Sequence, residues 1–237
     1  MSTMRFSEVG AVVSNIAAQS SEHAARLDSF SKAVSPHMKV FAHSVFMCGL
    51  VRASGKYAYS FWLGLMMSFV MGFFGGFTSN LLMNELPNIF KLDWILVGHF
   101  VAHWLLSCVP HVGDAYARAW PVSSFCKMCS NVMRVHTIFD RLELARAHYP
   151  GACISPILLG FIGGSGGGIT ADTIDVFTGA KPVQQHELLN FGFTSRTGFL
   201  FAIVYYIAYV CTHAYVYTDG LRAIVSCDAL HYSSSIN

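Results

Sequence analysis

Two long stretches of this sequence carry no charged side chain, and each holds a cluster of glycines near its centre. Residues 57–84 contain Gly72-Phe73-Phe74-Gly75-Gly76, and residues 148–171 contain Gly160-Phe161-Ile162-Gly163-Gly164. Each stretch exceeds the about 20 apolar residues that a helix needs to cross a bilayer. Glycine inside a helix costs about 1 kcal/mol relative to alanine. Two matching clusters at membrane depth therefore indicate that these glycines have a structural or functional role.

The composition supports a membrane protein. Hydrophobic residues make up 54% of the 237 residues and charged residues only 12%, whereas a soluble domain carries about 25% charged residues. The formal net charge of +2 is too small to indicate nucleic-acid binding. Seven cysteines, an odd number found mostly in apolar runs, do not fit a secreted disulfide framework. Residues 1–35 lack the apolar core of a cleavable signal peptide.

Six segments are expected to cross the membrane. Besides the two glycine-bearing stretches, residues 94–113 and 197–218 are uncharged, and Pro110 breaks the former near its end. The first segment opens at Pro36, and its Lys39 and Arg52 must snorkel or face protein. The fourth segment follows Pro121. Residues beyond 218 hold at most the start of a seventh helix.

Prolines and glycine clusters recur at nearly the same offset. Pro36 and Pro121 are 85 residues apart, and the glycine clusters are 88 residues apart. A unit of three crossings places its second copy upside down in the membrane, which predicts two inverted three-helix repeats. The expected fold class is an all-α polytopic membrane protein. It comprises a lead-in (1–35), a first repeat (36–113), a second, inverted repeat (114–218) and a C-terminal segment (219–237).

One face of the fourth segment carries a polar stripe. Its members are spaced three, four and seven residues apart: Ser123, Lys127, Ser130, Arg134, Thr137 and Arg141. A cation at the bilayer centre costs about 2.5–3.5 kcal/mol, and the nearby carboxylates sit at the ends of spans. We predict that Lys127, Ser130 and Arg134 face a hydrated cavity and bind an anion such as a lipid phosphate. Alternatively, Lys127 and Arg134 snorkel or pair with carboxylates.

The glycines support two interpretations. Six small residues in a row, 163–168, expose backbone groups that can hold ions or phosphate when they face protein or water. We predict that both helices are interrupted at their clusters and line a permeation path with Gly75, Gly76, Gly163, Gly164, Ser165 and Gly166. Close packing between helices is the alternative. For the first cluster, close packing and a permeation path are equally favoured. The length of the second cluster favours the permeation path.

Other motifs suggest chemistry that the sequence does not support further. Gly163-Gly164-Ser165-Gly166 matches the G-x-S-G of intramembrane serine proteases, with His213 as a candidate base. Those enzymes place the histidine two spans after the serine, and here one span separates them. His99 and His103 have metal-ligand spacing but no acidic or cysteine partner at their depth, so no metal site is predicted.

Asp172 and Asp175 directly follow the fifth segment. Two carboxylates at this place would attract cations to the mouth of a channel. A solvated helix end is the other interpretation, and the sequence leaves both open.

These features resemble those of the trimeric intracellular cation (TRIC) channels, over about residues 36–218, and most closely the metazoan type-B branch. Asn131-Val132-Met133-Arg134-Val135 is similar to the family's Lys-Glu-Val-x-Arg stretch. Gly163-Gly164-Ser165-Gly166 is similar to its Lys-Gly-Ser-Gly, and Ser107-Cys108-Val109-Pro110 to its Cys-Pro.

The resemblance implies a homotrimer of the endoplasmic or sarcoplasmic reticulum membrane, with a pore in each protomer. It implies a bound phosphoinositide, with phosphatidylinositol 4,5-bisphosphate as the expected species, and passage of monovalent cations, chiefly potassium, that balance calcium release. The sequence departs from the family pattern at Ser130 and Gly163, which replace lysines, and at Asn131, which replaces a glutamate. We infer that Lys127, one turn from Ser130, contributes to lipid binding in place of the family's lysine at position 130.

The predicted function is therefore a monovalent cation channel that is not an enzyme and binds no nucleic acid. A small-solute secondary transporter with inverted repeats is the first alternative. An intramembrane serine protease that uses Ser165 and His213 is the second.

Overall fold

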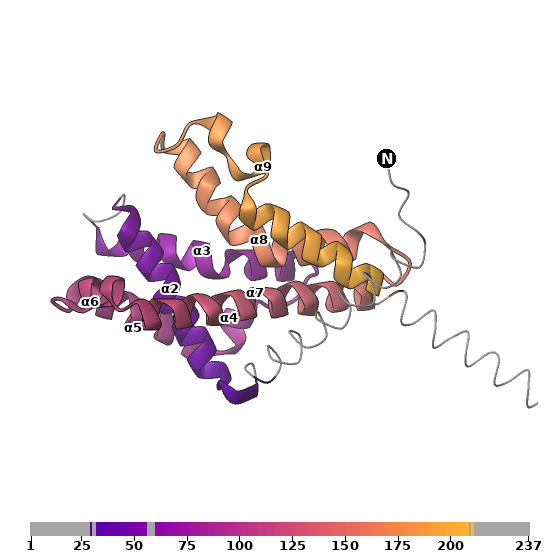
Figure 1. Ribbon diagram of the computed structural model, residues 1–237. Helices are drawn as coiled ribbons and strands as arrows, with labels where there is room; N and C mark the ends of the chain where they lie inside the picture. Colours follow the sequence, from indigo (N-terminus) through magenta and orange to yellow (C-terminus); the bar gives the residue numbers. More distant parts are fainter. Residues whose placement is uncertain (1–28, 30–31, 56–59, 209, 211–237) are drawn as a thin grey trace, which may run out of the picture. The chain divides into compact units, whose positions relative to one another are not determined.

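The computed structural model describes residues 29, 32–55, 60–208 and 210, and these residues form helices and loops without strands (Figure 1). The elements are α2 (Pro36–Ser54), α3 (Phe61–Leu82), α4 (Asn88–Lys91), α5 (Asp93–Cys108), α6 (Val112–Arg118), α7 (Trp120–His148), α8 (Ile154–Phe177), the 3-10 turn η1 (Val183–Gln185) and α9 (Glu187–Asn190). The last helix within the described residues spans Phe193–Ala208 and is called the final helix below. The all-α prediction is confirmed for this part of the chain. Residues 219–237, His213 and most of residues 1–35 lie outside it.

Helices occupy the described parts of the six predicted segments. Within the described residues, α3 and α8 are each long and apolar enough to cross a membrane, and α5 with α6 passes the same test as one bent span. These two helices meet at an angle of 94°, at the break that Pro110 predicted. The final helix, Phe193–Ala208, is apolar but shorter within the described part of the chain.

Two compact units share the long helices α3 and α7. Unit 1 is drawn from residues 1–68 and 92–133, and unit 2 from residues 69–91 and 134–237. Each unit therefore combines segments from both predicted repeats, and the inverted symmetry of those repeats stays a prediction. The two units are described separately below.

In unit 1, α2 packs on α5 through small residues. The side chain of Ser35 accepts a hydrogen bond from the amide of Met38 and caps the helix start, where Pro36 has no N–H to satisfy. Cys48 of α2 packs with Ala102 and Leu106 of α5 in a buried cluster. The serine cap and the following proline set the start of α2, and the small buried side chains let α5 pack closely on it.

Arg52 holds the bent span together. Pro110 has no N–H to donate to the carbonyl of Leu106, and Arg52 Nη1 donates to that oxygen at 2.8 Å. Arg52 Nη2 pairs with Asp114 Oδ1 of α6 at 3.0 Å. A Cβ atom at Gly113 would lie 2.5 Å from Arg52 Cζ, so a glycine is needed where the guanidinium passes. Of the two options that the sequence left for Arg52, the structure shows that it faces protein.

We expect Arg52→Lys to lower the free energy of unfolding by about 1–2 kcal/mol, because one ammonium cannot bridge the Leu106 carbonyl and Asp114 with fork geometry. Thermal unfolding in detergent measures this loss. Arg118→Lys is the matched control, since Arg118 is exposed and, within the described residues, donates to a carbonyl of its own helix at 3.3 Å. Equal losses in the two variants would contradict the bridging role.

In unit 2, α8 runs without a break through its glycine run (Figure 1). The prediction that the helices are interrupted at the glycine clusters is wrong, because α3 is also continuous. The glycines instead allow α3 and α8 to touch through their backbones. A Cβ atom at Gly75 would lie 2.6 Å from the carbonyl oxygen of Gly163, and one at Gly166 would lie 2.9 Å from Gly75 Cα.

The same helix packs on α7 through other glycines. A Cβ atom at Gly160 would lie 3.1 Å from the carbonyl oxygen of Ile138, and one at Gly164 would overlap the Ile138 side chain. Ile138 and Leu142 of α7 are fully buried together with Ala202 of the final helix. The glycine-rich helix α8 thus contacts both α3 and α7.

Candidate functional site

The guanidinium of Arg134 lies among acceptors from α8 and from the start of the final helix. Its Nε donates to the carbonyl of Gly164 at 2.8 Å. Its Nη2 donates to Ser165 Oγ at 3.3 Å, to Thr197 Oγ1 at 3.2 Å and to the carbonyl of Thr194. These contacts tie α7, α8 and the final helix together within unit 2.

Two glycines lie against the Arg134 side chain. A Cβ atom at Gly198 would lie 3.0 Å from Arg134 Nη2 and would overlap Ser165 Oγ. A Cβ atom at Gly164 would overlap the Ile138 side chain and would lie 3.7 Å from Cγ of Arg134. Within the described residues the contacts of Arg134 come from Nε and Nη2, which leaves Nη1 without a protein partner there.

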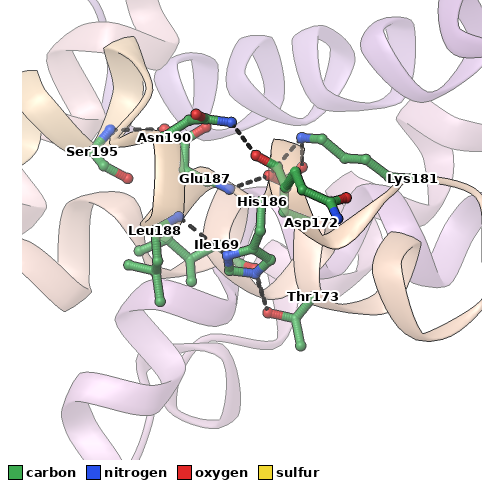
Figure 2. A network of polar contacts seen from close by, with 10 residues as sticks. Ile169, Asp172, Thr173, Lys181, His186, Glu187, Leu188, Asn190 and Ser195 are labelled. Atoms are coloured by element: carbon green, nitrogen blue, oxygen red, sulfur yellow. Dashed lines mark hydrogen bonds and ion pairs between the residues drawn. The ribbon is translucent and has the colours of Figure 1, made fainter.

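A polar network in the linker between α8 and the final helix continues from this site (Figure 2). Lys181 Nζ donates to both carboxylate oxygens of Asp172, at 2.8 and 2.7 Å. The amide of Glu187 donates to Asp172 Oδ2 at 2.8 Å, and Glu187 Oε1 accepts from the amide of Ser195 at 3.0 Å. The Asp172 carboxylate, which the sequence placed at a possible acidic mouth, is therefore paired with a lysine.

The structure places the predicted lipid-binding residues in different units. Lys127 is exposed on α7 in unit 1. Ser130, also in unit 1, is buried, and its Oγ lies 2.9 Å from His43 Nδ1 in a hydrogen bond. Arg134 belongs to unit 2. Lipid binding by these three residues stays a prediction.

The predicted pore-lining residues all belong to unit 2. Gly75, Gly163, Gly164 and Gly166 occupy positions where a side chain would strike a neighbouring helix, and Ser165 is buried with its Oγ donating to the carbonyl of Thr194 at 3.3 Å. Gly76 has more space, since the nearest described atom to a Cβ there would be Cγ2 of Thr137, at 3.8 Å. Helix packing accounts for these glycines directly, and a role in lining a pore stays a prediction.

Sequence reasoning missed Glu187, Thr194 and Thr197. It found no carboxylate at the depth of Arg134, yet the Glu187 carboxylate interacts electrostatically with that guanidinium from the linker. A Thr-Ser pair at the start of an apolar helix is a signal for polar groups near a helix N-terminus. Thr194-Ser195 carries this signal, whereas nothing in the sequence around Glu187 marks its position.

The histidine pair of α5 hydrogen-bonds inside unit 1. His99 Nε2 lies 3.0 Å from Ser68 Oγ, and His103 Nε2 lies 3.1 Å from the carbonyl oxygen of Phe61. No cluster of three or more metal-ligating side chains occurs among the described residues.

Continuous apolar helices packed through glycines, with an arginine held among their backbone carbonyls, define a polytopic helical membrane protein. The family model described as TRIC channel matches residues 47–226. This match covers most of the sequence, and the chain belongs to the TRIC channel family.

Solved structures share the fold. A TRIC counter-ion channel, from work on calcium release, has a TM-score of 0.66 and 18% identity, with 78% of this chain and 85% of that chain covered. A trimeric intracellular cation channel from C. elegans without Ca2+ has a TM-score of 0.61 and 21% identity, with 80% and 86% covered. Its Ca2+-bound form has a TM-score of 0.59 and 22% identity, with 77% and 82% covered. The search among curated proteins gave no match.

Family membership settles the class of protein. It confirms the predicted family and the all-α polytopic membrane fold. It also confirms that the chain is a channel protein and not an enzyme, so the serine-protease alternative is wrong. Ser165 instead takes part in the packing around Arg134.

Proposed function

We propose that this chain forms a homotrimeric channel for monovalent cations, chiefly potassium, in the endoplasmic or sarcoplasmic reticulum membrane. Its current would balance the charge that leaves with calcium. The family match over residues 47–226 carries the proposal. Similar structures are described as TRIC counter-ion channels in calcium release and as trimeric intracellular cation channels, which supports the trimer and the counter-ion role.

Planar-bilayer recordings test the conduction. With purified protein and a potassium chloride gradient, the reversal potential should lie near the potassium equilibrium potential. Unitary currents should exceed about a million ions per second, faster than a transporter whose domains move in microseconds to milliseconds. Slow, stoichiometric uptake without unitary currents would instead support the small-solute transporter. Native mass spectrometry of the same sample reports whether the protein is a trimer.

We further propose that a phosphoinositide, such as phosphatidylinositol 4,5-bisphosphate, binds with Lys127, Ser130 and Arg134. Two observations support this proposal. Arg134 Nη1 has no partner among the described residues, and a guanidinium nitrogen is a strong donor to phosphate. Lys127 is exposed, so its ammonium is accessible to a lipid head group. Ser130 contributes less, since its hydroxyl already bonds to His43.

Lys127→Gln should weaken phosphoinositide retention about two- to fivefold, the effect of losing one exposed ion pair of up to about 1 kcal/mol. Folding should be unchanged, because the side chain is exposed. Native mass spectrometry of protein titrated with phosphatidylinositol 4,5-bisphosphate measures the retention. The control is Lys91→Gln, which removes another partly exposed lysine, one that is paired with Glu85. Equal retention in wild type and Lys127→Gln would remove Lys127 from the site.

A further inference from the structure

One peptide bond in unit 2 lies between a guanidinium and a carboxylate. The carbonyl of Thr194 accepts a hydrogen bond from Arg134 Nη2, and the amide of the next residue, Ser195, donates to Glu187 Oε1 at 3.0 Å. The two charges therefore hold opposite ends of the same peptide dipole. Such an arrangement strengthens both hydrogen bonds, because each polarises the group that makes the other.

The carboxylate at this peptide is itself fixed in place. The backbone amide of Glu187 donates to Asp172 Oδ2, and Lys181 neutralises Asp172 through both oxygens. Asp172 and Lys181 are mostly buried, with 18% and 24% of their side chains exposed. Figure 2 shows this sequence of contacts from Lys181 to Ser195.

The absence of a side chain at Gly192 leaves space for the Glu187 carboxylate. A Cβ atom at Gly192 would lie 2.6 Å from Glu187 Oε2, so a larger residue there would displace it. Ser195, whose amide it accepts, is fully buried. The buried Ser195 amide is thus shielded from water, so a water molecule does not readily replace Glu187 as its hydrogen-bond acceptor.

We infer that Glu187 is a positioning residue for Arg134: through the Thr194–Ser195 peptide it fixes where the guanidinium is held, and the Asp172–Lys181 pair fixes Glu187. This inference rests on the proposed cation conduction for its functional readout. The Glu187 carboxylate also interacts electrostatically with the Arg134 guanidinium. Without Glu187, the Thr194–Ser195 peptide that accepts from the guanidinium is no longer held at its amide end, and Arg134 loses the attraction of a carboxylate. The less compensated positive charge would oppose the entry of cations.

Single-channel recordings of Glu187→Ala and Glu187→Gln test the inference. The alanine variant should lower the unitary potassium conductance about two- to fivefold, the effect of roughly 1 kcal/mol of electrostatic repulsion. The glutamine variant keeps an acceptor oxygen without the charge, so its conductance should lie between those of the alanine variant and wild type. Asn190→Ala is the matched control. It removes another hydrogen bond of the same linker, to the carbonyl of Gln184, that does not lead to Arg134.

A double-mutant cycle separates positioning from general damage to the linker. If Glu187 acts through Arg134, Glu187→Ala should have little further effect on conductance in an Arg134→Gln background, where both the fork and the positive charge are absent. An unchanged conductance in Glu187→Ala, an equal loss in Asn190→Ala, or fully additive losses in the cycle would each overturn the inference.

Hydrogen exchange gives a readout that does not depend on conduction. The Ser195 amide should exchange faster in Glu187→Ala than in wild type, and at a rate close to wild type in Glu187→Gln. Equal exchange in all three proteins would overturn the positioning role even if currents were normal. If the wild-type protein carries no current but the three proteins show the expected exchange rates, the proposed function is refuted. The positioning of the Thr194–Ser195 peptide by Glu187 would still be supported.

Discussion

Gly75→Ala is expected to destabilise the protein by about 3 kcal/mol, the upper end of the usual cost of overpacking. The added Cβ would lie 2.6 Å from the carbonyl oxygen of Gly163, 2.7 Å from that of Ile162 and 3.1 Å from the amide nitrogen of Gly166. All three are backbone atoms, which cannot change rotamer to make room. The helices α3 and α8 must therefore separate, and the gain of about 1 kcal/mol in helix propensity from alanine does not offset that loss.

Gly98→Ala is the matched control for this experiment. Gly98 also lies inside an apolar helix, α5, but a Cβ atom there meets nothing within 4 Å in the described part of the chain. The same substitution at Gly98 should be neutral or stabilise by up to about 1 kcal/mol. Thermal unfolding of both variants in one detergent measures the difference. If Gly75→Ala unfolds at the temperature of Gly98→Ala, close packing is not the reason for the glycine at position 75.

The sequence predicted the helical segments well, because uncharged stretches of membrane-spanning length permit little else. The bend after α5 was predictable for a local reason, since Pro110 removes a backbone donor. The continuity of α3 and α8 was not. Helix propensity gives the cost of glycine in an isolated helix. It does not predict whether a second helix packs into the space that the missing side chain leaves. The close approach of Gly75 to Gly163 and Gly166 supplies the packing that keeps both helices intact.

The site was predictable in part. The polar stripe correctly singled out Arg134 as a cation within an apolar region that needs partners. Its partners were not predictable, because the carbonyls of Gly164 and Thr194 carry no sequence signal. Glu187 reaches the site only because the linker folds back onto the end of α8, where Asp172 accepts its amide. Such contacts depend on the tertiary fold and have no period or motif along the chain.

Arg134→Ala is expected to have two separable effects. It removes hydrogen bonds to α8 and to the final helix, which should lower the free energy of unfolding by about 3 kcal/mol, the lower end of the cost of breaking a buried charged network. If the lipid proposal holds, it should also weaken phosphoinositide binding by about 1.5–3 kcal/mol, the worth of a hydrogen bond to a charged group. Thermal unfolding without lipid measures the first effect, and lipid titration by native mass spectrometry the second.

Arg134→Lys separates the two roles, because it keeps the charge and loses the fork. The lysine variant should lose most of the stability that the alanine variant loses, since one ammonium cannot reach both the Gly164 carbonyl and the Thr197 hydroxyl with the same geometry. The lysine variant should retain more lipid than the alanine variant, because phosphate oxygens also accept hydrogen bonds from an ammonium group. Equal lipid retention in all three proteins would refute the lipid role of Arg134 and leave it as a structural tie. Equal stability in all three would mean that the contacts around the guanidinium do not hold α7, α8 and the final helix together.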